Sequence, residues 1–153
     1  MKKLAIIAIL ATAAVAASAT DLGLRVGRVA GAETSVVGVA TEGVTLGQKF
    51  GTFGAEVAYD RALVGASSLS RYSLVGTYDV AKVAVATVTA KAGGVFIDPT
   101  VGANGYAALV GVGASYPLTK NVSLVADYAY QVGQDRVKLF NGNVVSIGTK
   151  YSF

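Results

Sequence analysis

The chain ends on N-V-V-S-I-G-T-K-Y-S-F, from Asn143 to Phe153, and this stretch decides the fold. From Val145 onward every second residue is apolar, β-branched or aromatic, and the residues between them are small or polar. This period of two is typical of a β-strand with two unlike faces. A strand of this kind at a chain end is an aggregation-prone edge unless it pairs. We therefore expect it to pair with the first strand and close a barrel, with its apolar face outward.

The same alternation recurs upstream and predicts seven further strands. They are expected over residues 22–29, 43–50, 53–61, 71–80, 85–97, 105–116 and 122–132. A small-residue loop is expected over residues 62–70, and a turn near Lys82. Eight strands of this length, joined in sequence, predict an all-β fold, an antiparallel up-and-down barrel that spans a membrane.

The charged residues distinguish a membrane barrel from a soluble one. A soluble, lipocalin-like carrier would place charges on its outer surface and bulky apolar side chains inside, whereas here the charges share the face with the small residues. An eight-stranded lumen is just filled by side chains, so we expect a closed polar lumen plugged by ion pairs. Lys150 is expected beside Glu56 or Asp79. The predicted lumen charge network comprises Arg25, Lys49, Glu56, Asp79, Lys91, Asp127 and Lys150.

Aromatic residues are expected to form two belts on the apolar face. If both chain ends lie in the periplasm, one belt gathers at the periplasmic strand ends and the other toward the outer ends, as membrane interfaces favour. The alternative is that aromatic residues are simply common in strands. The lower belt comprises Phe50, Phe53, Tyr78, Tyr116, Tyr151 and Phe153, and the upper belt comprises Tyr59, Tyr72, Phe96, Tyr106 and Tyr130.

The first 19 residues have the three parts of a signal peptide. Lys2 and Lys3 give a basic start, an apolar run follows, and Ala17-Ser18-Ala19 is a small-x-small cleavage pattern. A membrane anchor, the alternative, would need ~20 apolar residues. We expect cleavage before Thr20, leaving residues 20–153 as an exported barrel domain.

The composition excludes several classes of function. Without the two leader lysines the mature chain has eleven basic and nine acidic residues. This small excess of positive charge does not indicate nucleic-acid binding. The absence of Cys excludes a disulfide framework, and the absence of His removes the usual general base and the commonest metal ligand. No later segment runs for 18 apolar residues, so no second spanning helix is expected. We expect neither a cofactor nor a metal.

The side chains that could support catalysis are not arranged for it. Ser67, Ser68 and Ser70 have no His base and are interpreted as turn residues. Asp60 and Asp79 could form a carboxylate pair, but we expect them near opposite ends of the barrel.

Two further motifs can be interpreted as structural residues or as functional ones. Gly23-x-x-x-Gly27 and Gly111-x-Gly113 lie within expected strands and lack the features of a phosphate loop, so they are interpreted as lumen residues that make room for larger neighbours. Arg136, Lys138 and Phe140 could touch lipopolysaccharide phosphates, or be solvated loop residues.

These features resemble the small eight-stranded outer-membrane barrels of Gram-negative bacteria, the OmpA transmembrane-domain, OmpX and opacity-protein group. The likeness covers residues 20–153 and is carried by the signal peptide, by Y-P-L-T-K-N-V-S-L with D-Y-A-Y at residues 116–130, and by the final K-Y-S-F. It implies that Tyr151 and Phe153 are the signal read by the barrel-assembly machinery; the alternative is that Phe153 only belongs to the lower belt. We expect no peptidoglycan-binding segment after the barrel, unlike in OmpA, and we expect short connections, unlike in the opacity and adhesion barrels.

We therefore expect a monomeric outer-membrane barrel of a Gram-negative bacterium, not an enzyme, that supports envelope integrity and makes surface contacts through short loops. Its expected partners are outer-membrane lipid, lipopolysaccharide and the assembly machinery. A narrow channel for small solutes is the main alternative, since the lumen charges could form a gated path. A lipid-modifying enzyme is a weaker one.

Overall fold

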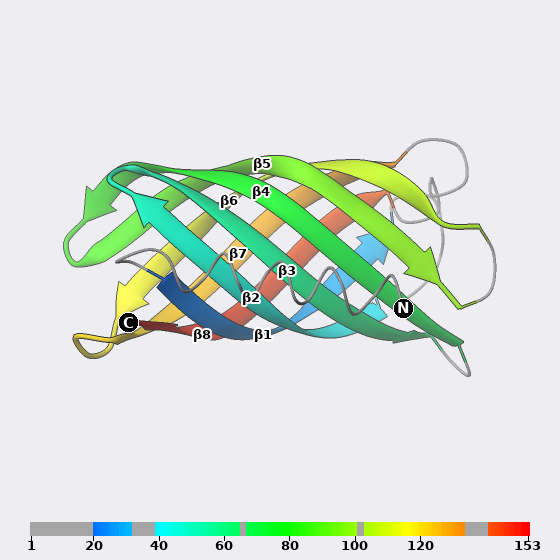
Figure 1. The fold of residues 1–153 in the computed structure, drawn as a ribbon, viewed down its shortest axis with the longest axis horizontal. Coiled ribbons are helices and arrows are strands. Elements are labelled where there is room, and N and C mark those ends of the chain that lie inside the picture. Colours follow the sequence, from blue (N-terminus) through cyan, green and yellow to red (C-terminus); the bar gives the residue numbers. More distant parts are fainter. Residues whose placement is uncertain (1–19, 32–38, 65–66, 101–102, 134–140) are drawn as a thin grey trace.

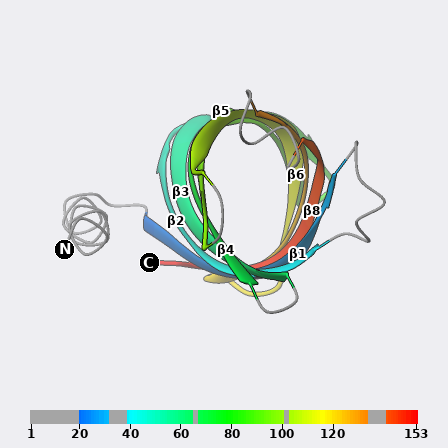
Figure 2. The same cartoon turned by 90° about the vertical axis from the view of Figure 1, so that its right-hand side faces the viewer.

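The computed structural model describes residues 20–31, 39–64, 67–100, 103–133 and 141–153 of the 153-residue chain. Eight β-strands follow one another in this part, and each pairs antiparallel with its neighbour in sequence. β1 (Thr20–Gly31) also pairs with β8 (Gly142–Ser152), which closes the sheet into a barrel (Figure 1, Figure 2). The predicted eight-stranded up-and-down barrel is confirmed.

The six remaining strands alternate in direction between the two ends of the barrel. They are β2 (Val39–Phe50), β3 (Phe53–Val64), β4 (Ser67–Val83), β5 (Ala86–Pro99), β6 (Gly105–Pro117) and β7 (Val122–Gly133). We call the end with the β2–β3, β4–β5 and β6–β7 connections and Phe153 the turn end; it lies at the left in Figure 1. The opposite end is called the loop end.

Two predicted connections are wrong. β3 runs to Val64 and β4 begins at Ser67, so most of the loop predicted over residues 62–70 is strand. Small residues misled the prediction here, because Ala62 and Leu69 are buried core residues of paired strands and not turn residues. Lys82 also lies within β4, since the turn after it falls at Ala84 and Val85.

The strands have two unlike faces, as their alternation predicts. Among the described residues, twenty-five large apolar or aromatic side chains are exposed on the outer surface, including Leu24, Leu74, Val110 and Ile147. The residues between them turn into the lumen and are small, polar or charged over most of its length. The barrel is therefore apolar outside and largely polar inside.

The closing strand follows this rule closely. Val145, Ile147 and Tyr151 are about half exposed on the outer surface, whereas Ser146 is buried in the lumen. β8 pairs with β1 from Asp21↔Ser152 to Gly31↔Gly142 and with β7 along its other edge, so neither edge is left open.

Some sequence-based predictions fall outside the described residues. These are the signal peptide with Ala17 and Ala19, and the Arg136, Lys138 and Phe140 patch. Within the described part of the chain, no helix has the length and apolar character that a bilayer crossing requires.

Candidate functional site

The candidate site is the barrel lumen, where charged side chains from seven of the eight strands meet. Each points inward because it occupies the polar phase of an alternating strand. Charges buried in this way require partners, since an unpaired one costs several kcal/mol.

Two ion pairs lie at the turn end. Lys49 Nζ lies 2.5 Å from Asp79 Oδ2, and the Thr89 hydroxyl donates to the other oxygen of this carboxylate at 3.0 Å. Lys150 Nζ lies 3.0 Å from Asp21 Oδ2, and Ser152 Oγ donates to Asp21 Oδ1 at 2.5 Å. Lys150 therefore forms its ion pair with Asp21, and it also interacts electrostatically with Asp79, one of its two expected neighbours.

A four-residue cluster, which we call the central network, occupies the middle of the lumen. It consists of Arg25 (β1), Glu56 (β3), Lys91 (β5) and Asp127 (β7). Lys91 Nζ lies between two carboxylates, 3.2 Å from Glu56 Oε2 and 2.8 Å from Asp127 Oδ1. Arg25 Nη1 lies 3.6 Å from Glu56 Oε1. The network therefore joins four alternate strands across the lumen.

Asp60 links the central network to a second arginine. Arg25 donates to both of its carboxylate oxygens, at 2.7 and 2.6 Å, and Arg71 Nη1 lies 3.5 Å away. Arg71 Nη2 donates to Gln131 Oε1 at 2.7 Å. Asp60, Arg71 and Gln131 are 2%, 3% and 0% exposed, so this group is shut off from solvent. Arg71 Nε is buried with no hydrogen-bond partner in the structure.

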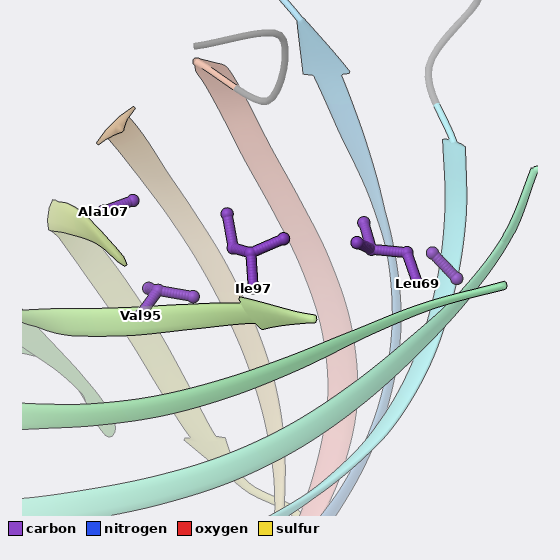
Figure 3. Packing of buried hydrophobic residues seen from close by; sticks show 5 residues of the cluster. Leu69, Val95, Ile97 and Ala107 are labelled. Carbon is purple, nitrogen blue, oxygen red and sulfur yellow. The ribbon is translucent and has the colours of Figure 1, made fainter. Parts of the chain in front are cut away.

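An apolar cluster lies in the lumen on the loop-end side of this group (Figure 3). Ala62 follows Asp60 on the inward face of β3, and Leu69 precedes Arg71 on β4, each one inward position nearer the loop end. We call the cluster the apolar plug; its members are Ala62, Leu69, Val95, Ile97 and Ala107. The lumen that was expected to be polar is therefore apolar at its loop end.

The described lumen residues enclose small cavities, two of which lie on either side of the central network. One of about 60 Å³ lies toward the turn end and is lined by Asp21, Lys49 and Lys150, and one of about 40 Å³ lies beside Arg71. Residues of the central network line both cavities, so the network separates them. Each has room for only a few water molecules. Among the described residues, no group of three or more acidic side chains is placed to hold a metal ion.

The predicted network omitted several lumen residues that the structure brings into it, namely Asp21, Asp60, Arg71 and Gln131. Alternation could have identified all four, because each is an even number of residues from a predicted lumen residue of its own strand: Arg71, for example, is eight residues from Asp79. The alternation that assigns these residues to the inward face was present, but the residues lay at or beyond the ends of the expected strands.

The aromatic side chains gather at the two ends of the outer surface. At the turn end, Phe53 contacts Tyr78 and Tyr151 contacts Phe153, each pair with ring centroids 4.9 Å apart. Toward the loop end, four rings form a continuous row across β3 to β6, with centroids 5.1 to 6.3 Å apart: Tyr59, Tyr72, Phe96 and Tyr106. These residues are direct cross-strand partners, so the row follows the hydrogen-bonding direction of the sheet.

The candidate catalytic side chains are separated or engaged elsewhere. Ser68 Oγ lies 2.7 Å from Thr100 Oγ1, and Ser70 Oγ lies 3.4 Å from Tyr59 Oη. Asp60 belongs to the Arg71 group, whereas Asp79 belongs to a turn-end ion pair, so the two carboxylates do not form a pair. The Ser67 side chain lies outside the described residues.

Comparisons with solved structures identify known proteins that share this fold. Neisserial surface protein A is similar over 90% of this chain and 98% of its own, with a TM-score of 0.73 and 16% identity. The N-terminal β-barrel domain of Pseudomonas aeruginosa OprF matches over 89% and 98%, with a TM-score of 0.69 and 14% identity. The Pseudomonas aeruginosa outer membrane protein OprG matches over 90% and 96%, with a TM-score of 0.64 and 11% identity.

The sequence comparisons add no closer relative, because no protein-family model and no curated protein matches the chain. At identities this low, the structural likeness shows the fold. The chain has the fold of the small eight-stranded outer-membrane barrels, as the sequence-based resemblance predicted.

Proposed function

We propose that this protein is a closed, membrane-embedded barrel of the Gram-negative outer membrane that supports envelope integrity and contacts its surroundings through its surface. In this proposal residues 1–19 are a cleaved signal peptide, and the turn end faces the periplasm. The lumen is a structural interior that holds the eight strands together. It is neither a solute path nor a catalytic site.

The observation that carries the proposal is the combination of an apolar outside with an ion-paired inside that holds only small cavities. The twenty-five large apolar or aromatic side chains exposed in the described part of the barrel form far more apolar surface than a water-soluble monomer carries. Strands of 11 to 17 residues are long enough for the ~9–11 residues needed to cross a bilayer at a tilt. Lipid is the environment that matches this surface.

The side chains that fill the lumen favour a structural role over the conduction of solutes. A solute would have to pass the turn-end pairs, the central network and the apolar plug in succession. The first two obstacles require ion pairs to separate in a low-dielectric interior, and the third requires tightly packed side chains to move aside.

The remaining partners follow from surface residues. The exposed Tyr151 and Phe153 at the turn end are suited to recognition by the assembly machinery during insertion. The row of Tyr59, Tyr72, Phe96 and Tyr106 is suited to the interface with lipopolysaccharide, because aromatic rings favour the boundary between apolar chains and polar head groups. We propose that the barrel acts as a monomer.

A deletion strain tests the role in the envelope. We expect a Gram-negative bacterium that lacks the gene to become more sensitive to detergent, and expression of the wild-type protein to restore resistance. The variant Val112→Arg should not restore it, because Val112 is exposed on β6 between Tyr106 and Tyr116, where an arginine facing lipid costs ~2–4 kcal/mol. Val112→Leu is the matched control and should restore resistance. Unchanged sensitivity in the deletion strain would contradict the proposal.

Planar bilayers test the sealed lumen. We expect the purified, refolded protein to give no steady conductance, and the double variant Glu56→Ala/Asp60→Ala, which breaks the lumen ion pairs, to raise current fluctuations above the wild-type level. A large, steady conductance from the wild-type protein would show that the lumen is a channel.

A further inference from the structure

The Arg71 side chain is buried in the lumen with one donor that no described protein group accepts. Its Nη2 donates to Gln131 Oε1 at 2.7 Å, and its Nη1 lies 3.5 Å from Asp60 Oδ2. Both oxygens of that carboxylate also accept from Arg25. Arg71 Nε has no hydrogen-bond partner among the described residues, although Arg71 is only 3% exposed. A buried donor without an acceptor is costly and rare in folded proteins, so this group needs a partner.

The cavity of about 40 Å³ in the lumen lies against this side chain, and we call it the Arg71 cavity. Its wall includes three hydroxyl groups, from β2, β4 and β8: Thr41, Ser73 and Ser146. Within the described residues, the structure gives none of these hydroxyls a hydrogen bond. Ser73 occupies the next inward position after Arg71 on β4. Because a hydroxyl both donates and accepts, the wall offers several partners to a small polar molecule beside Arg71.

The charged groups around the Arg71 cavity balance one another. Three cations and three carboxylates line it: Arg25, Arg71, Lys91, Glu56, Asp60 and Asp127. An added ion would leave a net charge in a low-dielectric interior, which is unfavourable. The occupant that fits is therefore neutral, accepts a hydrogen bond from Arg71 Nε and donates to oxygen atoms of the wall. The volume has room for about two or three molecules of the size of water.

We propose that the Arg71 cavity is a binding site for ordered water, in which a water oxygen accepts the hydrogen bond of Arg71 Nε. The bound water donates in turn to the hydroxyl and carboxylate oxygens of the cavity wall. It completes the hydrogen bonding of Arg71, whose carboxylate partner Asp60 is shared with Arg25. The inference concerns the interior of the barrel only, so it does not depend on the role proposed for the protein in the envelope.

Nuclear magnetic resonance of the arginine Nε–H groups tests the site. The protein is labelled with ¹⁵N and refolded in detergent micelles, and cross-peaks between arginine Hε and water are recorded. A rotating-frame experiment distinguishes, by sign, a water held beside the proton from exchange of the proton with solvent. Arg25 is the control within the same molecule, because its Nε donates to Asp60 Oδ1 at 2.7 Å. Arg71→Lys and Arg25→Lys assign the two resonances.

The Hε of Arg71 is expected to show a cross-peak with bound water, and the Hε of Arg25 none. Ala129→Leu is expected to abolish the Arg71 cross-peak, because Ala129 lines the cavity and a leucine there fills the space of the water. This variant keeps the three hydroxyls, so a signal relayed through a hydroxyl proton would persist in it. Ala126→Leu, on the outer face of the same strand, is the matched control and is expected to keep the cross-peak.

Three results would overturn the inference. They are no water cross-peak at Arg71 in the wild-type protein, equal cross-peaks at Arg71 and Arg25, and a cross-peak that persists in folded Ala129→Leu. A saturable movement of the Arg71 resonance on addition of chloride would identify an anion as the occupant and would also overturn it. If circular dichroism shows that Ala129→Leu does not fold, the comparison of Arg71 with Arg25 in the wild-type protein still decides.

Discussion

At the residue scale, Asp60 contacts two guanidinium groups, those of Arg25 and Arg71, in a part of the lumen closed to solvent. Its bidentate contact with Arg25 satisfies both carboxylate oxygens. Removing one partner of a buried ion pair leaves the other charge uncompensated, which costs more than the pair itself contributes. Asp60 therefore has a larger effect on stability than the ion pairs nearer the turn end.

We expect Asp60→Asn to lower the free energy of unfolding by about 3–5 kcal/mol. Asp79→Asn is the matched control, and its loss should be about 1 kcal/mol or less because its partner Lys49 is one-third exposed. Urea unfolding in lipid vesicles, followed by circular dichroism or by gel mobility, measures both. Equal losses would contradict the burial of the Asp60 group.

Two adjacent glycines on β5 give a second residue-scale test. A Cβ at Gly93 would lie 2.1 Å from the Leu74 carbonyl oxygen and 2.6 Å from the Val75 Cα, whereas a Cβ at Gly94 would have no heavy atom within 4 Å. Gly93→Ala should destabilise the barrel by about 1–3 kcal/mol, because backbone atoms must move. Gly94→Ala should be neutral or slightly stabilising. The same urea titration compares them, and a larger loss at Gly94 would mean that the two faces are inverted.

The sequence was sufficient to assign most lumen residues to a face but not to pair them. Alternation gives the face of a residue, whereas its partner depends on the register between strands. Lys150 shows the difference, because the β1–β8 register sets it opposite Gly23 and Asp21 opposite Ser152, which brings Lys150 to Asp21 and not to Glu56. Arg71 was missed because it began a strand whose true start is Ser67.

At the element scale, the β4–β5 hairpin shows where turn prediction from sequence fails. Its turn residues, Ala84 and Val85, include no Gly, Asn, Asp or Pro, which are the residues that usually mark a turn. Ala84 adopts a φ of 55°, in the left-handed region that a residue with a Cβ rarely enters. The turn was therefore expected near Lys82 instead.

Ala84→Gly is expected to stabilise the hairpin by about 0.5–1 kcal/mol, because glycine enters the left-handed region without the penalty of a Cβ. Ala81→Gly is the control within the same hairpin and should be destabilising, since Ala81 is in a paired strand. The midpoint of thermal unfolding in vesicles checks both variants. A loss of stability in Ala84→Gly would contradict the left-handed turn.

At the scale of the whole molecule, the fold was predictable because the alternation is repeated in eight strands and each repeat supports the next. The count of strands, their antiparallel order and the closure by the last strand all followed from it. The apolar plug was not predictable, because apolar residues on an inward face break the rule by which that face is recognised. Val95 and Ile97 share the inward phase of Lys91 yet belong to the plug.

The central claim is that the chain is a closed barrel embedded in a membrane. Cells that express it are broken, the outer-membrane fraction is isolated, and the protein is compared on a gel with and without boiling. We predict that the protein leaves this fraction only with detergent and that the unboiled form migrates faster, because the closed barrel of eight strands stays compact until heat unfolds it. A mature protein that stays in water after the membranes are removed, or that migrates identically with and without boiling, would contradict the account.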